Sequence, residues 1–254
     1  KAADVAIVMN DGAQISKDVA DIVLLDNNMS TLPLAFKEGT EITQTLYGTA
    51  KLFLAKNFYN TLLFVFVLVM ALPFPVTAIQ ISWSGFGPIN MPGGFMALGL
   101  LRPQFIKSFR RDVLDYVIIS GFFGAGGMAI MFLVAFWSYD LKQAQYAMTL
   151  FMTLYSLNIS LNVCGIDVWN PRTYRLYPIG TFIILAFTFG TMAVAMLVPQ
   201  IFQFYLPPID LMALVISLFL LVTILTKRTL HQRLLLHQIY TLANDDGESP
   251  HLRL

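Results

Sequence analysis

The sequence predicts a mainly helical, polytopic membrane protein with six spanning helices, preceded by a small α/β segment. Composition supports the membrane assignment, because 57% of the 254 residues are hydrophobic and only 12% are charged. Soluble domains have about 25% charged residues, and half that share cannot cover the surface of a soluble globule of this size. The charge is also unevenly distributed, since charged residues punctuate residues 1–50 and become sparse after Lys56.

Six apolar runs follow the polar start, and a helix crosses a bilayer with about 20 residues. They cover residues 52–72, 76–101, 113–137, 144–165, 177–199 and 211–226. None shows the polar stripe at 3.6-residue spacing that a helix of a soluble protein carries. We therefore predict a six-helix transmembrane domain over residues 51–226, followed by a cytoplasmic tail over residues 227–254.

Basic residues gather in alternate loops, which predicts the orientation. They are Arg102, Lys107, Arg110 and Arg111 in one loop, Arg172 and Arg175 in another, and Lys227, Arg228 and Arg233 in the tail. The intervening loops, at residues 73–75, 138–143 and 200–210, contain one basic residue, Lys142. Because basic loops stay on the cytoplasmic side, we expect a multi-pass protein with both ends in the cytoplasm, in the plasma membrane.

Charge and cysteine content exclude several classes of function. A formal net charge of +1 provides no basic excess to hold phosphates, so nucleic acid is not an expected partner. A single cysteine permits neither an internal disulfide nor a multi-cysteine metal cluster. The chain starts at Lys1 with no signal-like segment after it, so we expect an internal piece of something longer.

The polar start has its own pattern. Short apolar runs at residues 5–9 and 22–25 flank residues 13–20, which predicts strand, short helix and strand at the edge of a parallel α/β sheet. A following helix, capped by Ser30 or Thr31, leads toward the membrane. The alternative is that residues 1–50 form a disordered cytoplasmic arm.

Three stretches resemble P-type cation-transporting ATPases. Residues 1–9 (Lys-Ala-Ala-Asp-Val-Ala-Ile-Val-Met) and 20–28 (Ala-Asp-Ile-Val-Leu-Leu-Asp-Asn-Asn) are similar to paired runs at the end of the family's phosphorylation domain. Residues 38–42 (Glu-Gly-Thr-Glu-Ile) resemble the element leading into the fifth membrane helix. The resemblance therefore implies the end of a HAD-like, Rossmannoid phosphorylation domain over residues 1–50, followed by membrane helices five to ten.

The resemblance also implies an ATP-driven pump. Such proteins phosphorylate an Asp in an Asp-Lys-Thr-Gly-Thr motif and hold Mg²⁺ at a Gly-Asp-Gly-x-Asn-Asp motif, and neither motif occurs in this chain. We expect ATP and Mg²⁺ to bind upstream of this segment, no catalytic residue within it, and no activity of the segment alone. The implied partners are membrane lipid, the transported cation and the missing N-terminal domains of the same polypeptide.

The second apolar run is interrupted in a way that is typical of an ion pathway. Glycines and prolines cluster over residues 85–94, among them Pro88 and Pro92, and prolines remove backbone donors and free carbonyls. Irregular backbone at membrane depth survives only inside protein or beside a cavity. Ser84 and Asn90 add side-chain oxygens. The alternative is a helix kinked for packing, with serine hydroxyls bonded to their own helix.

Asn57, Asn60 and Thr61 of the first run are further candidates for the ion pathway. Asn57 and Asn60 lie on one helical face, at positions where calcium pumps of the family carry Asn and Glu. The alternative is hydrogen bonding between helices. No Asp or Glu lies in either run, unlike in calcium and sodium pumps, so the metal is unknown. Lys56 is either a built-in positive charge or a side chain that extends to the cytoplasmic interface.

The polar residues Asn158, Ser160 and Asn162 of the fourth run are predicted to pack spans four to six together. The rival to the pump is a non-catalytic membrane transporter, or a truncated helical scaffold without ATPase activity.

Overall fold

A computed structural model describes residues 4–245, apart from the side chains of residue 171 and of residues 234–245. Residues 246–254 of the predicted tail lie outside the described residues. The chain divides into two compact units, Lys1–Gln44 and Thr45–Leu254. It is mainly helical, and its only sheet within residues 4–245 has two strands.

The first unit contains the predicted strand, helix and strand. They are β1 (Ile7–Met9), α1 (Gln14–Asp18) and β2 (Ile22–Leu24). The strands pair in parallel, with Ile7 opposite Ile22. The backbone N–H of Ala6 donates to the Asp21 carboxylate at 2.8 Å, which fixes the start of the pairing. The strand–helix–strand prediction is confirmed, and the disordered arm is not what the structure shows.

The remaining elements are helical. After the short 3₁₀ turn η1 (Met29–Thr31) come α2 (Leu32–Val69), α3 (Ala78–Gly85), the π-helical turn η2 (Phe86–Asn90), α4 (Met91–Ala97), a second π segment η3 (Phe109–Leu114), α5 (Asp115–Ser138), α6 (Leu141–Val163), α7 (Pro171–Leu176), α8 (Pro178–Leu197), α9 (Pro199–Phe202) and α10 (Ile209–Asp245). Helix α2 contains residues of both units.

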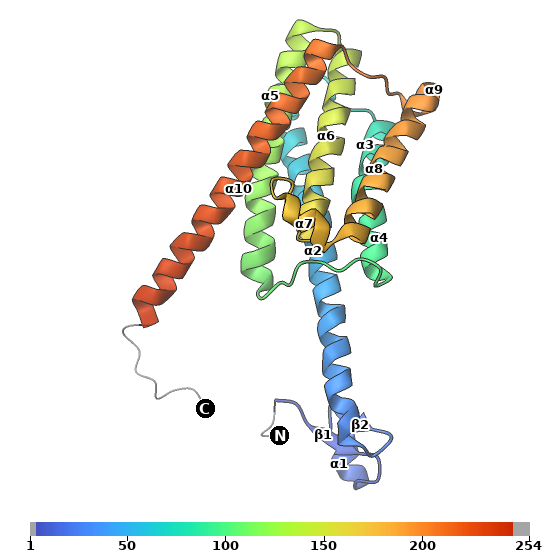
Figure 1. The fold of residues 1–254 in the computed structure, drawn as a ribbon, viewed down its shortest axis with the longest axis vertical. Coiled ribbons are helices and arrows are strands. Elements are labelled where there is room, and N and C mark those ends of the chain that lie inside the picture. The colour runs from blue at the N-terminus through green and yellow to red at the C-terminus, as the bar shows by residue number, and fades with distance from the viewer. Residues whose placement is uncertain (1–3, 246–254) are drawn as a thin grey trace. The chain divides into compact units, whose positions relative to one another are not determined.

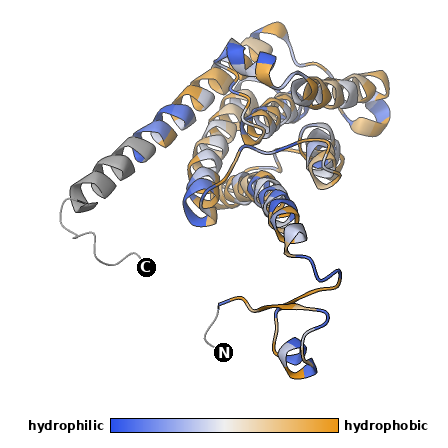
Figure 2. Cartoon of the chain, turned by 60° about the horizontal axis from the view of Figure 1, so that its bottom comes forward, coloured by the Kyte–Doolittle hydropathy of each residue, from blue (hydrophilic) through white to orange (hydrophobic). Residues whose placement is uncertain are grey.

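Four helices within the described residues are long and apolar enough to cross a membrane. These segments are Met29–Val69, Phe109–Ser138, Pro178–Leu197 and Ile209–Arg233. Apolar residues cover most of the helices of the second unit, while hydrophilic ones gather near helix ends and loops (Figure 2). The two other predicted spans correspond to the interrupted segment α3–η2–α4 and to α6, neither of which is among these four.

The position of helix α6 in the bundle explains why its hydropathy is lower than that of the four long apolar helices. It packs against α3, α5, α8 and α10 and lies between them in the bundle (Figure 1). Its polar side chains Thr149, Thr153 and Ser156 are buried among those helices, and the two threonine hydroxyls donate to carbonyls one turn back in the same helix. Protein surrounds this helix, so its polar groups are satisfied without facing lipid.

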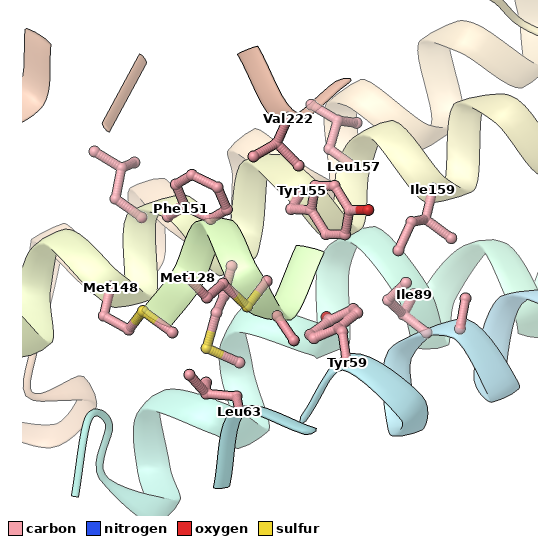
Figure 3. Packing of buried hydrophobic residues seen from close by; sticks show 14 of the residues in the cluster. Tyr59, Leu63, Ile89, Met128, Met148, Phe151, Tyr155, Leu157, Ile159 and Val222 are labelled. Atoms are coloured by element: carbon pink, nitrogen blue, oxygen red, sulfur yellow. The ribbon is translucent and has the colours of Figure 1, made fainter. Parts of the chain in front are cut away.

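The core of the second unit centres on aromatic and sulfur-containing side chains (Figure 3). Tyr59 of α2 and Tyr155 of α6 are fully buried and meet edge to face, with ring centroids 5.7 Å apart. The Tyr59 hydroxyl lies 2.8 Å from the Ser156 hydroxyl, and the Tyr155 hydroxyl donates to the Ser120 carbonyl at 2.5 Å. Hydrogen-bonded aromatic rings thus join α2, α5 and α6.

Helix α3 begins at a capping box. The Thr77 hydroxyl accepts from the backbone N–H of Gln80 at 3.3 Å, and the Gln80 side chain accepts from the backbone N–H of Thr77 at 2.9 Å. These bonds satisfy two backbone donors that have no helical partner.

Replacing Thr77 with alanine is expected to lower the free energy of unfolding by about 1 kcal/mol, because the helix loses its cap. Thermal unfolding of the purified protein in detergent measures this. Thr40→Ala is the matched control, since Thr40 is exposed on α2 and only bonds back to the Phe36 carbonyl. Equal melting temperatures for both variants would contradict the prediction.

A candidate ion site at the interrupted helix

The interruption of the second apolar run is built by residues that cannot continue an α-helix smoothly. Helix α3 ends at Gly85, five residues form the π turn η2, and α4 then starts with Pro92 in its first turn. Pro88 sits inside the π turn and has no N–H, so one carbonyl of the preceding turn loses its helical donor. Pro88 and Pro92 are both buried. The middle of the π turn is thus buried in protein, while Phe86 and Asn90 at its two ends are exposed.

Two neighbouring helices hold this irregular backbone in place. The Ser160 hydroxyl of α6 donates to the Pro88 carbonyl. Gly87 lies against α8, where a Cβ atom would stand 2.5 Å from the Phe187 carbonyl oxygen and would also clash with the Thr191 hydroxyl. Only glycine therefore allows the π turn to approach α8 this closely.

Helix α2 lines the other side of the interruption. The Lys56 ammonium lies directly against Gly85, with the Lys56 Cε 2.8 Å from where a Cβ of that glycine would stand. Phe53 approaches Gly93 in the same way, at 3.0 Å. Lys56 therefore points across to the end of α3. Of its two sequence-based interpretations, this placement fits an internal positive charge.

Asn60 lies one helical turn beyond Lys56, on the same face of α2. Its side chain is partly buried, and its Oδ1 atom is buried with no hydrogen-bond partner within the part of the chain that the structure describes. A buried carbonyl oxygen without a donor costs about 1–3 kcal/mol. A bound cation, or a donor from outside the chain, would remove that cost.

The other predicted site residues differ in their exposure. Asn57, Thr61 and Asn90 are exposed in this chain. Ser84 is buried, but its hydroxyl donates to the Ile81 carbonyl of its own helix at 3.3 Å, which was the alternative for this serine. The structure therefore brings Lys56 against the end of α3, with the buried Asn60 oxygen one turn further along α2, whereas Asn57, Thr61 and Asn90 are exposed.

Oxygen atoms near the interruption are neutral. No Asp or Glu occurs between residues 52 and 97, and the described residues contain no group of three or more His, Cys, Asp or Glu that could hold a metal. The site thus offers carbonyl, amide and hydroxyl oxygens beside one ammonium group. Such a set suits a weakly held or monovalent cation better than a divalent one, which prefers carboxylates.

Comparison with known proteins gives consistent matches to ion pumps. No family model matches the chain. Curated relatives include a calcium-transporting ATPase of Bacillus subtilis, 33% identical over 41% of this chain and 12% of its own length. The calcium-transporting ATPase CtpE of Mycolicibacterium smegmatis is 28% identical over 54% and 18%. The human sodium/potassium-transporting ATPase subunit alpha-4 is 26% identical over 55% and 14%.

The chain is similar to P-type ATPases over about half of its length. The matches and the apolar helices together support a C-terminal portion of a P-type ATPase, and a multi-pass integral membrane protein. The matched part amounts to less than a fifth of the length of each of these relatives.

Sequence reasoning missed two contacts that shape the candidate site in this chain. Ser160 bonds to the interrupted helix, whereas the expectation was that it packs spans four to six together. The Thr191 and Phe187 surface of α8 was not considered. Polar residues at 158, 160 and 162 of the sequence signalled a buried face of α6, but periodicity does not reveal which helix that face meets.

Proposed function

We propose that the chain is the C-terminal part of an ATP-driven cation pump and contains half of its ion pathway. In this proposal the polypeptide crosses the membrane six times. Four passes are the long apolar helices, and the interrupted segment α3–η2–α4 and α6 make the other two. The length of α6, 23 residues, is sufficient to span a bilayer.

The observation that carries the proposal is the buried, unpartnered Asn60 oxygen on α2, one helical turn beyond the Lys56 side chain that contacts the helix break at Gly85. Pumps and transporters commonly bind ions where a broken helix frees carbonyls inside the protein. Here the break faces Lys56, and Asn60 follows one turn later. Asn57, Thr61, Ser84 and Asn90 stay in the proposal as pathway residues, as do the carbonyls around Pro88 and Pro92.

Helix α2 is the proposed coupling element. It contains residues of both compact units in one unbroken helix. The parallel β1–β2 pair that precedes it fits the edge of a HAD-like phosphorylation domain, and the outer edges of this pair, which have no strand partner among the described residues, fit a larger sheet. In this proposal ATP and Mg²⁺ bind to upstream domains of the same polypeptide, and movement of those domains is transmitted through α2.

The proposed orientation places both ends in the cytoplasm, and the proposed location is the plasma membrane. Support comes from the basic residues in the loop before α5, in α7 and in α10 after Thr226. The names of the relatives leave calcium, sodium and potassium as cations to test.

The test is cation-stimulated ATP hydrolysis by the full-length protein. Asn60→Ala is expected to raise the half-saturating cation concentration about tenfold, because removing one ligand of a charged group costs on the order of 1.5–3 kcal/mol. Asn57→Ala is expected to weaken the response to a smaller extent, because Asn57 is exposed in this chain.

Gln200→Ala, on the exposed surface of α9, serves as the control and should behave as the unmodified protein does. An unchanged cation dependence in both asparagine variants would reject the site. Absence of any cation-stimulated hydrolysis or phosphoenzyme in the full-length protein would reject the pump itself and favour a scaffold without ATPase activity.

A further inference from the structure

A hollow of about 370 Å³ lies away from the interrupted helix, between α5, α6, α10 and the segment that follows α6. Its inner wall is uncharged and includes the polar residues Ser120, Asn158 and Thr226. All three are buried. Lys227 and His231 of α10 stand on its outer wall. A second hollow adjoins it and shares Trp169, Lys227 and His231 with the first.

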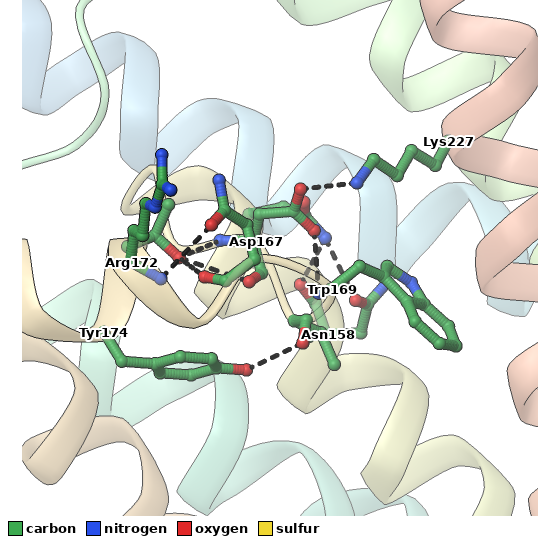
Figure 4. Close-up of polar contacts among 10 residues, drawn as sticks. Asn158, Asp167, Trp169, Arg172, Tyr174 and Lys227 are labelled. Carbon is green, nitrogen blue, oxygen red and sulfur yellow. Dashed lines mark hydrogen bonds and ion pairs between the residues drawn. The ribbon is translucent and has the colours of Figure 1, made fainter.

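Positive charge dominates the outer wall. Lys227 forms an ion pair with Asp167 at 2.5 Å (Figure 4). Arg228 lines the second hollow, and it forms no ion pair with any side chain that the structure describes. Two cations and one carboxylate leave one net positive charge when His231 is neutral. That charge matches a single phosphodiester group.

In the proposed six-span arrangement, the hollows lie at the boundary between hydrocarbon and water. The apolar run over residues 211–226 ends directly before Lys227 and Arg228. Ile224 and Trp169 line the second hollow and are 36% and 41% exposed. Indole rings and the stems of basic side chains both favour this interfacial depth. A ligand here meets cations at one end and an apolar surface at the other.

We propose that these hollows bind one anionic phospholipid. Its phosphodiester would lie beside Lys227, Arg228 and His231, its headgroup hydroxyls would face Asn158 and Thr226, and an acyl chain would follow Ile224 and Trp169. A water-soluble phosphate would satisfy the charge and leave the apolar surface exposed. A zwitterionic lipid brings an extra positive charge to a wall that is already positive.

The experiment counts lipids that remain bound to the full-length protein. The protein is delipidated, mixed with phosphatidylglycerol, phosphatidylethanolamine or phosphatidylcholine of identical acyl chains, and examined by native mass spectrometry. We expect one phosphatidylglycerol to be retained at a concentration where the other two are lost. Arg228→Gln should weaken its retention about fivefold, because each basic residue near a membrane surface contributes that factor toward anionic lipid.

Two variants distinguish the effect of the Arg228 charge on lipid binding from an effect on folding. Arg228→Gln leaves the Lys227–Asp167 ion pair intact, so its melting temperature should not change. Lys142→Gln, an exposed lysine near the start of α6, is the matched control and should retain lipid normally. Equal retention of the three lipids, unchanged retention by Arg228→Gln, or displacement of the lipid by millimolar inorganic phosphate would each overturn the proposal. Each of these outcomes is independent of pump activity.

Discussion

Replacing Gly87 with alanine is expected to destabilise the membrane domain by about 3 kcal/mol. The added Cβ would stand 2.5 Å from the Phe187 carbonyl oxygen and would clash with the Thr191 hydroxyl. A backbone carbonyl in the middle of α8 cannot rotate away, so η2 and α8 must separate, and overpacking of this kind costs about 1–3 kcal/mol or more. Thermal unfolding in detergent, followed by loss of helical circular dichroism or by aggregation, measures the change.

Gly94→Ala is the matched control for that variant. Gly94 lies in α4, seven residues further along the chain, and a Cβ there meets nothing within 4 Å. Alanine is the better helix former by about 1 kcal/mol, so this variant should be neutral or slightly stabilising. If Gly87→Ala and Gly94→Ala melt at the same temperature, the close approach of η2 to α8 is wrong.

Replacing Tyr155 with alanine is expected to cost about 3–5 kcal/mol of unfolding free energy, which is typical of removing a large aromatic ring from a core. Tyr155 is fully buried, packs on Tyr59 and Phe151, and bonds to the Ser120 carbonyl. The ring therefore joins three helices. Denaturation of the purified protein by increasing mole fractions of sodium dodecyl sulfate measures the loss.

Tyr155→Phe divides this cost into two parts. It keeps the ring and removes only the hydroxyl, and hydrogen bonds between membrane helices contribute about 0.6 kcal/mol on average and up to about 1.7. Phe122→Ala is the control for ring size, because Phe122 is 69% exposed on α5. A Tyr155→Ala variant as stable as Phe122→Ala would show that α6 does not occupy the centre of the bundle.

The local elements were predictable because their signals are local. Two β-branched runs separated by a helix-length segment gave β1, α1 and β2, and the parallel pairing followed from that order. Apolar runs gave α2, α5, α8 and α10, since length and hydropathy are sums over neighbouring residues. The glycines and prolines of residues 85–94 likewise indicated an interruption, which the structure shows as η2.

The contacts of the site were not predictable in the same way. Sequence spacing placed Asn57, Asn60 and Thr61 on the first membrane helix, with Asn57 and Asn60 on one face, but it did not indicate which of them the fold would bury. The structure buries the Asn60 oxygen and leaves Asn57 and Thr61 exposed. Lys56 had two interpretations because its direction depends on a neighbour, and Gly85 of α3 is that neighbour.

The sequence by itself determined a helical membrane protein, the break in its second apolar run, and the absence of acidic residues around that break. These properties depend on composition and on spacing along the chain. Only the tertiary structure decided that α6 lies in the centre, that Ser160 holds the Pro88 carbonyl, and that Gly87 is required against α8. Each of these contacts is made between different helices, and Ser160 and Pro88 are 72 positions apart in the sequence. Periodicity indicates which face of a helix is buried, but it does not indicate which helix covers that face.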